Sequence, residues 1–294
     1  MVGSAILRLF KKKNFTNLVT KTSKQLNLID QKKTINFLKN LKPDCVIIAA
    51  AKVGGINANN KYRADFLYNN LQIQNNLIHG SYLAGVKRVI FLGSSCIYPK
   101  TCKQPIKEKY LLNSPLEYTN EPYAIAKISG IKMIENYNHQ YKLNYLSLMP
   151  CNLYGPNDNY NLETSHFIPA LIKKIHFAKI KNNRHIDLWG DGKPKREVMH
   201  VDDLALAVLF FLNKKISYSY VNIGSGKEFT IRQYAQIISN ILGYKGKIKF
   251  DRSMLNGTPR KLLDCSISNS YSWYPRIDLE EGLKNTYQDF IQSI

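Results

Sequence analysis

The chain has 294 residues and is 44% hydrophobic, which suits one large or two closely joined globular domains. Its net charge is +21, but the lysines are spread along the whole chain rather than gathered in a pattern. We therefore expect no nucleic-acid partner, because a nucleic-acid footprint is patterned and not merely basic. No apolar run approaches the roughly 18 residues needed to cross a bilayer, so we expect no membrane partner either.

The five cysteines stand at irregular spacings, with no C-x-x-C pair to suggest a metal site. Unpaired cysteines are typical of a reducing compartment, and Lys11 to Lys13 follow the first apolar stretch instead of preceding it, as a signal peptide would require. We expect a cytoplasmic protein without a metal.

Alternating strands and helices predict a parallel α/β sheet in the first half of the chain. In chain order we expect a helix over 4–13, a strand over 17–20, a helix over 31–41, a strand over 44–50, a helix over 64–84, a strand over 88–94, a helix over 122–141 and a strand over 144–150.

The pattern changes after Pro150, where 151–159 is rich in turn residues. We then expect a helix over 166–178, a strand over 186–190, a segment 196–200 that leads into 201–213, a strand over 220–223 that returns to the main sheet, and a Thr-capped helix over 230–242. The tail from Lys247 is predicted to belong to a smaller lobe. The corresponding domains are 1–154 with about 198–223, and about 155–197 with 224–294.

The most informative residues are Ser94, Tyr123 and Lys127. Ser94 ends a predicted strand, and the four-residue spacing puts Tyr123 and Lys127 on one face of a helix. An ammonium beside a phenol would lower the phenol pKa toward working pH, and Ser94 could bond the same substrate oxygen. This set suits carbonyl reduction, or its reverse, beside a nicotinamide. A packed Tyr and a solvated Lys is the alternative, but Gly93 after an apolar run and Pro122 at the helix start favour the functional interpretation.

With these motifs the chain resembles the GDP-L-fucose synthase family of the extended short-chain dehydrogenase superfamily, over essentially its whole length. The segments that carry the resemblance are 49–56 (AAAKVGGI), 91–100 (FLGSSCIYPK), 120–127 (NEPYAIAK), 152–156 (NLYGP), 200–203 (HVDD) and 257–264 (GTPRKLLD). The resemblance implies a Rossmann-like doubly wound parallel sheet with a smaller α/β substrate lobe. It also implies that NADPH is the reductant and that GDP-4-keto-6-deoxy-D-mannose is epimerised at C3 and C5 and then reduced at C4.

The same resemblance implies roles for five residues. Cys96 and His166 would exchange protons at C3 and C5, although a small buried Cys and a helix-start His are the plainer interpretations. Tyr123 would give a proton to the C4 oxygen, supported by Lys127 and Ser94.

The family's cofactor contacts also map onto this chain. The residues implied for NADP(H) are Gly3, Ser23, Leu92, Gly93, Ser94, Ser95, Lys127, Pro150, Cys151, Asn152, Leu153 and His166. Lys21 and Lys24 could favour the 2′-phosphate as point charges, and Asp30 suits either an adenine contact or a helix cap.

Four further matches would hold the GDP-sugar substrate: Lys174, Trp189, Arg196 and Lys261. Arg196 suits a bidentate grip on phosphate, whereas Trp189 could be core and Lys174 a solvated charge. By resemblance alone we expect a homodimer that forms through a four-helix interface.

The N-terminus departs from the family pattern. Relatives begin with a strand that runs into a G-x-x-G-x-x-G loop, and here Gly3 matches only the last glycine. We expect the first strand of the sheet to be missing, and we interpret this as a start that lies upstream of Met1.

Two alternatives remain open. The chain could be another nucleotide-sugar epimerase or reductase, although a dehydratase usually has Thr-Asp-Glu where this chain has Ser94-Ser95-Cys96. It could also be a non-catalytic nucleotide-sugar-binding relic that lacks its phosphate loop.

Overall fold

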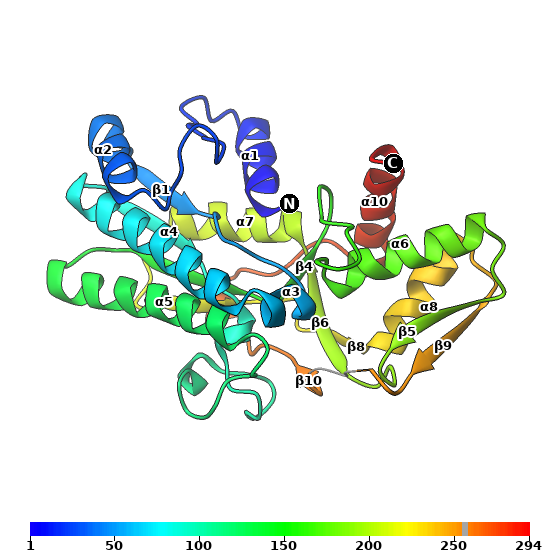
Figure 1. Cartoon of the computed structure of the whole chain (residues 1–294). Coiled ribbons are helices and arrows are strands. Elements are labelled where there is room, and N and C mark those ends of the chain that lie inside the picture. The colour runs from blue at the N-terminus through cyan, green and yellow to red at the C-terminus, as the bar shows by residue number, and fades with distance from the viewer. Residues whose placement is uncertain (255–257) are drawn as a thin grey trace.

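A parallel sheet lies at the centre of the computed structural model, which describes residues 1–254 and 258–294 (Figure 1). The first residue of the segment 257–264 therefore lies outside the described residues. The sheet has the order β1-β2-β3-β7, and every pair is parallel. Its strands are β1 (Cys45–Ile48), β2 (Arg88–Leu92), β3 (Leu146–Pro150) and β7 (Tyr220–Ile223). All residues of β2 and β3 are buried, as expected of strands covered by helices on both faces.

Two layers of helices cover this sheet (Figure 1). In one layer α4 packs against both α2 and α5, and in the other α1 packs against α7. These helices are α1 (Val2–Lys12), α2 (Gln31–Leu41), α4 (Arg63–Leu83), α5 (Glu121–Tyr141) and α7 (Val201–Leu212), with the short α3 (Ile56–Lys61), η1 (Ser95–Ile97) and η2 (Glu108–Tyr110) in the loops. The arrangement confirms the expected Rossmann-like α/β fold.

A second lobe has a hydrophobic core of its own, shown at the right of Figure 1. One sheet has the order β10-β6-β4 with β8 on β6, and β5 pairs with β9. The strands are β4 (Asn152–Tyr154), β5 (His185–Trp189), β6 (Lys195–His200), β8 (Glu228–Thr230), β9 (Lys247–Asp251) and β10 (Arg260–Lys261). The helices are α6 (Phe167–Ile180), α8 (Ile231–Leu242) and α10 (Leu279–Gln292), while α9 (Ser266–Ser270) contacts β7 of the main sheet.

The structure corrects two of the expected elements. Residues 17–20 form no strand, and Val19 is 54% exposed. In the part of the chain that the structure describes, β1 pairs only with β2, so 17–20 has no strand beside it to supply the ladder on which so short an element depends. Conversely, 152–154 is expected to lie within a loop but forms β4, because β6 lies alongside and pairs with it.

Asn222 on β7 ties the main sheet to the loops around the carboxyl ends of its strands. Its side chain accepts a hydrogen bond from the Tyr98 hydroxyl (2.6 Å) and donates to the carbonyls of Ile106 (2.9 Å) and Asp264 (3.1 Å). Its backbone N–H donates to Glu108 at 2.9 Å. Asn222 is fully buried, so solvent cannot replace these bonds.

We predict that Asn222→Ala lowers the free energy of unfolding by about 2–4 kcal/mol, because it removes the partner of the buried Tyr98 hydroxyl and of the partly buried Asp264 carbonyl. Urea denaturation measures the change. Asn113→Ala is the matched control, since Asn113 is exposed and its side chain bonds only to the Lys109 carbonyl among the described residues. Equal, small losses in the two variants would contradict the role given to Asn222.

Candidate active site

The turn after β2 carries Ser94 and Cys96 to the carboxyl edge of the sheet. The Ser94 hydroxyl accepts the N–H of Cys96 at 3.3 Å and so caps η1. Gly93 precedes this turn, and a Cβ there would lie 2.7 Å from the sulfur of Met149 on β3. The tight packing of β2 on β3 therefore requires glycine at the point where the chain leaves the sheet.

Helix α5 brings Tyr123 and Lys127 to the same edge. Lys127 is 3% exposed, and its ammonium donates to the carbonyl of Leu92 at 2.7 Å. The same nitrogen lies 5.8 Å from the centroid of the Tyr123 ring. The ring edge of Phe66 packs against Tyr123, with 6.3 Å between the ring centroids. The phenol is therefore held between α4 and the turn that follows β2.

The protonation of this pair differs from the expectation. Burial raises the pKa of Tyr123 well above its usual value, and the nearby Cys96 adds to the rise, so the net shift is upward although Lys127 is expected to lower this pKa. Burial is the main cause, and the ammonium of Lys127 is bonded to a backbone carbonyl instead of the phenol. Burial also lowers the pKa of Lys127 to about 8. At neutral pH Tyr123 is a proton donor.

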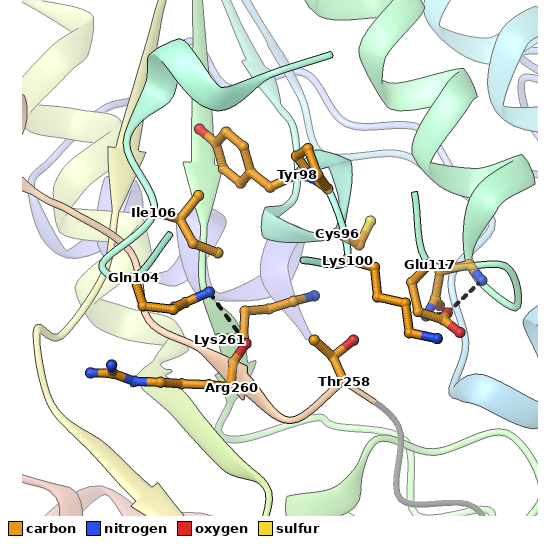
Figure 2. A pocket seen from close by; sticks show the side chains of 11 residues that line it. Cys96, Tyr98, Lys100, Gln104, Ile106, Glu117, Thr258, Arg260 and Lys261 are labelled. Atoms are coloured by element: carbon orange, nitrogen blue, oxygen red, sulfur yellow. Dashed lines mark hydrogen bonds between the residues drawn. The ribbon is translucent and has the colours of Figure 1, made fainter. Parts of the chain in front are cut away.

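A pocket beside Cys96 contains a second ammonium, that of Lys261. Figure 2 shows the Lys261 side chain from β10 reaching toward the space in front of Cys96. The residues that line the pocket are Cys96, Tyr98, Pro99, Lys100, Gln104, Ile106, Glu117, Asn120, Thr258, Arg260 and Lys261. Burial raises the pKa of the Cys96 thiol, whereas the positive charge of Lys261 acts in the opposite direction.

His166 is the exposed N-terminal cap residue of α6 and is not among the residues that line the pocket beside Cys96. Partial desolvation and the charge of Lys261 lower the pKa of His166, which favours the neutral imidazole. The residues before it rest on the loop after β1, where the Gly55 N–H donates to the Thr164 carbonyl at 2.8 Å. A Cβ at Gly55 would lie 2.4 Å from the Ser165 carbonyl oxygen, so glycine allows this close approach. The cleft thus joins residues from both lobes.

The predicted substrate residues fall into two groups. Arg196 and Lys261 are paired positions on β6 and β10, and burial lowers the pKa of Arg196 to about 10. Lys174 and Trp189 belong to the β5 region, because Lys174 donates to the Asp187 carbonyl (3.3 Å) and Trp189, half exposed, ends β5. The first group therefore shares its surroundings with Cys96, and the second lies along β5.

The residues predicted to contact NADP(H) also separate into groups. Leu92, Gly93, Ser94 and Ser95 follow β2, and Pro150, Cys151, Asn152 and Leu153 span the end of β3 and the start of β4, so both sets lie at the carboxyl edge of the sheet. Gly3 lies in the first turn of α1, where a Cβ would be 4.0 Å from that of Ala49 after β1.

Helix α1 begins at Val2, and its cap residue Met1 makes no side-chain hydrogen bond to the first amides. Such a helix start fits the diphosphate of a dinucleotide. Ser23 lies instead in an exposed turn, and the Asp30 side chain accepts the Lys33 N–H at 3.0 Å as the cap of α2.

The sequence interpretation missed several residues that line the pocket, and Glu117 is the most distinctive. Its Oε2 atom accepts bonds from the Thr119 hydroxyl (2.5 Å) and from the backbone and side-chain amides of Asn120 (3.1 and 2.8 Å). These bonds lower the pKa of Glu117 despite partial burial. The sequence could have indicated Glu117 as a site residue, because it lies just before α5 and Tyr123 stands in the first turn of that helix.

Two further findings concern only the residues that the structure describes. They include no group of three or more His, Cys, Asp or Glu side chains that could hold a metal ion. None of their helices is long and apolar enough to cross a membrane.

The Rossmann-like fold, with Ser94, Tyr123 and Lys127 at the carboxyl edge of its sheet, is that of a nucleotide-sugar epimerase or reductase, and the comparisons with known proteins agree. The model of the NAD dependent epimerase/dehydratase family matches residues 1–224, and the chain belongs to this family. GDP-L-fucose synthase 1 of Arabidopsis thaliana is 50% identical to this chain over 294 residues, which cover 100% of this chain and 91% of that protein.

Two more relatives extend the comparison. GDP-L-fucose synthase of Escherichia coli (strain K12) is 48% identical, with 100% of this chain and 94% of that protein covered. The structure of a GDP-mannoheptose C4 reductase from Campylobacter jejuni with NADP bound superposes with a TM-score of 0.90 at 37% identity, over 99% of this chain and 95% of that one. The resemblance to GDP-L-fucose synthases is thereby confirmed.

We predict that Lys261→Gln slows the alkylation of Cys96 by iodoacetamide at pH 8. The thiolate is the reactive form, and loss of the ammonium raises the thiol pKa, which costs about tenfold in thiolate for each pKa unit. Mass spectrometry of the peptide that contains Cys96 gives the rate. Lys100→Gln is the control, since Lys100 lines the same pocket but its side chain is exposed. Equal rates in both variants would refute the electrostatic coupling.

Proposed function

We propose that the protein converts GDP-4-keto-6-deoxy-D-mannose to GDP-L-fucose with NADPH, by 3,5-epimerisation followed by reduction of the C4 ketone. The observation that carries the proposal is the convergence of Ser94, Cys96, Tyr123 and Lys127 at one edge of the sheet, with Lys261 facing them from the second lobe. Full-length identity of about half to GDP-L-fucose synthases supports the choice of substrate.

NADPH, when bound, supplies a hydride to the C4 carbon. The amides at the N-terminus of α1 would hold its diphosphate, and residues 92–95 and 150–153 would line its path across the sheet edge. Lys127 keeps the turn after β2 in register with α5 through its bond to the Leu92 carbonyl. The family match and a relative solved with NADP bound support NADP(H) as the cofactor.

Tyr123 acts as the acid in the reduction. As negative charge develops on the C4 oxygen, the phenol transfers its proton there, and Ser94 donates a second hydrogen bond to the same atom. The raised pKa of Tyr123 suits this role because the phenol keeps its proton until the oxygen becomes strongly basic.

Cys96 and His166 exchange the protons at C3 and C5. Removal of a proton beside the ketone forms an enolate, whose charge rests on the same C4 oxygen that Tyr123 and Ser94 stabilise. Return of a proton from the opposite face completes the inversion. The neutral imidazole of His166 can accept a proton, and the thiol of Cys96, with its raised pKa, can donate one.

The nucleotide is held in the second lobe. Arg196 and Lys261, side by side on β6 and β10, would neutralise phosphate charge, and Lys174 and Trp189 on the β5 side would contact the rest of the nucleotide. A reductase of another GDP-4-keto sugar is the second candidate, supported by the likeness to the GDP-mannoheptose C4 reductase.

Two further features belong to this proposal. We place the protein in the cytoplasm, in keeping with five free cysteines. We also propose a homodimer through the outer faces of α4 and α5, where Tyr82, Tyr137 and Tyr141 form an aromatic cluster.

The first prediction concerns the reaction. The purified protein should oxidise NADPH, followed at 340 nm, when freshly made GDP-4-keto-6-deoxymannose is added, and GDP-mannose, which lacks the ketone, should give no reaction. Chromatography should identify GDP-L-fucose as the product. Turnover of a GDP-4-keto-heptose but not of the deoxymannose derivative would favour the second candidate.

The second prediction separates the two steps. Cys96→Ser should slow the incorporation of solvent deuterium at C3 and C5 of the sugar by about 10²–10⁴-fold, as expected for loss of a positioned acid or base. Tyr123→Phe should instead slow NADPH oxidation to a similar extent. Mass and NMR analysis of the sugar measures the exchange. Deuterium entry at the parent rate in Cys96→Ser would make Cys96 a structural residue.

A further inference from the structure

Glu197 is a buried carboxylate to which the reaction described above gives no role. It lies on β6 next to Arg196, and because neighbouring strand residues face opposite ways, its side chain points to the interior while Arg196 points to the cleft. Glu197 is only 2% exposed. Burial raises its pKa to about 7, against backbone N–H donors that favour the ionised form. A carboxylate kept in such surroundings needs a structural or functional reason.

The carboxylate bonds to two backbone segments that are far apart in sequence. Its Oε2 accepts the N–H of Leu263 at 2.9 Å, and its Oε1 accepts the N–H of Gly226 at 2.7 Å. The main-chain pairing of β6 with β10 ends at Lys261, so the bond to Leu263 continues that pairing with a side chain in place of a carbonyl. Glu197 therefore fixes the chain just after Lys261.

The other side of this segment is held as well. Leu262 donates to the Gln104 side chain at 2.9 Å and accepts the Ile106 N–H at 2.7 Å. Residues 262–263 are thus bonded to Glu197 on one side and to the loop 104–106 on the other. These bonds fix the backbone position of Lys261, from which its side chain extends toward Cys96 (Figure 2).

The Glu197 carboxylate packs closely against Gly224. A Cβ at Gly224 would lie 2.3 Å from Oε1 of Glu197 and 3.1 Å from the sulfur of Cys265. Glycine at this position therefore leaves the space that the carboxylate fills, and any larger residue would push the carboxylate away from its two N–H donors.

We propose that Glu197 is a positioning residue that sets the place of Lys261, and with it the charge that faces Cys96 and the GDP-sugar. This proposal rests on the proposed function for its substrate. The charge of Lys261 acts on both Cys96 and His166, and the charge of Arg196 acts on Lys261. A shift of the Lys261 backbone therefore changes substrate binding and thiol reactivity together.

The test compares the parent with Glu197→Gln and Gly224→Ala at pH 8, above the pKa of about 7 of the parent carboxylate. Glu197→Gln places an amide NH₂ opposite a backbone N–H, so one of the two bonds is lost. Gly224→Ala keeps the carboxylate but displaces it. For both we expect the KM for GDP-4-keto-6-deoxymannose to rise about tenfold to hundredfold, as loss of a hydrogen bond to a charged group predicts, with a smaller change in kcat and unchanged NADPH affinity.

A second readout does not depend on turnover. Iodoacetamide should alkylate Cys96 more slowly in both variants, and calorimetry should show weaker binding of GDP. Glu135→Gln is the matched control, since Glu135 is a surface residue paired with Lys132, and it should behave as the parent. If the parent fails to turn over the substrate, the proposed function fails, while alkylation and GDP binding still decide the role of Glu197.

Folded variants with parental KM, GDP affinity and alkylation rate would overturn the proposal, and so would a loss of stability with no change in these three quantities. If Glu197→Gln does not fold, Gly224→Ala decides the question by the same measurements. A parental alkylation rate in that variant means that the carboxylate does not position Lys261.

Discussion

The hydrogen bond from the Lys127 ammonium to the Leu92 carbonyl is the contact on which the geometry of the reacting centre depends. It joins α5 to the end of β2, and so it fixes Tyr123 relative to the turn that carries Ser94 and Cys96. The bond is strong because a charged donor meets a carbonyl in a buried site, where water cannot compete. It also explains why the ammonium does not pair with the phenol, since its hydrogen bond is committed to the backbone.

The second lobe adds a second positive charge in front of Cys96, that of Lys261, to the charge of Lys127 at the sheet edge. Lys261 acts in the same sense on its two neighbours, since its positive charge favours the deprotonated form of each, the thiolate of Cys96 and the neutral imidazole of His166. One cation thus keeps the imidazole of His166 in the form that can accept a proton and makes the thiol of Cys96 a stronger acid. Its own pKa is lowered by burial, so its position matters more than that of a solvated lysine.

Local sequence patterns predicted those helices and strands whose formation depends mainly on their own residues. β2 and α5 were predicted within a few residues, because a continuous apolar run and a Pro at the helix start are sufficient signals. Residues 152–154 form β4 because β6 lies alongside, and residues 17–20 form no strand because none of the described strands lies beside them. The sequence pattern of a segment does not show which strand lies next to it. The pocket shows the same limit, since Cys96 and Lys261 meet across 165 positions of sequence, and the resemblance, not the periodicity, put both in one site.

The direction of the Tyr123 pKa shift bears on which reaction the site favours. A phenolate would accept a proton from an alcohol and favour oxidation, whereas a buried phenol with a raised pKa holds its proton and gives it only to a strong base. The C4 oxygen becomes such a base as the carbonyl is reduced. Lys127, with a pKa of about 8, keeps its charge at neutral pH and can stabilise the phenolate left behind, 5.8 Å from the ring centroid. Burial therefore selects the proton donor before the reaction, and the buried ammonium lowers the energy of the charge that the reaction creates.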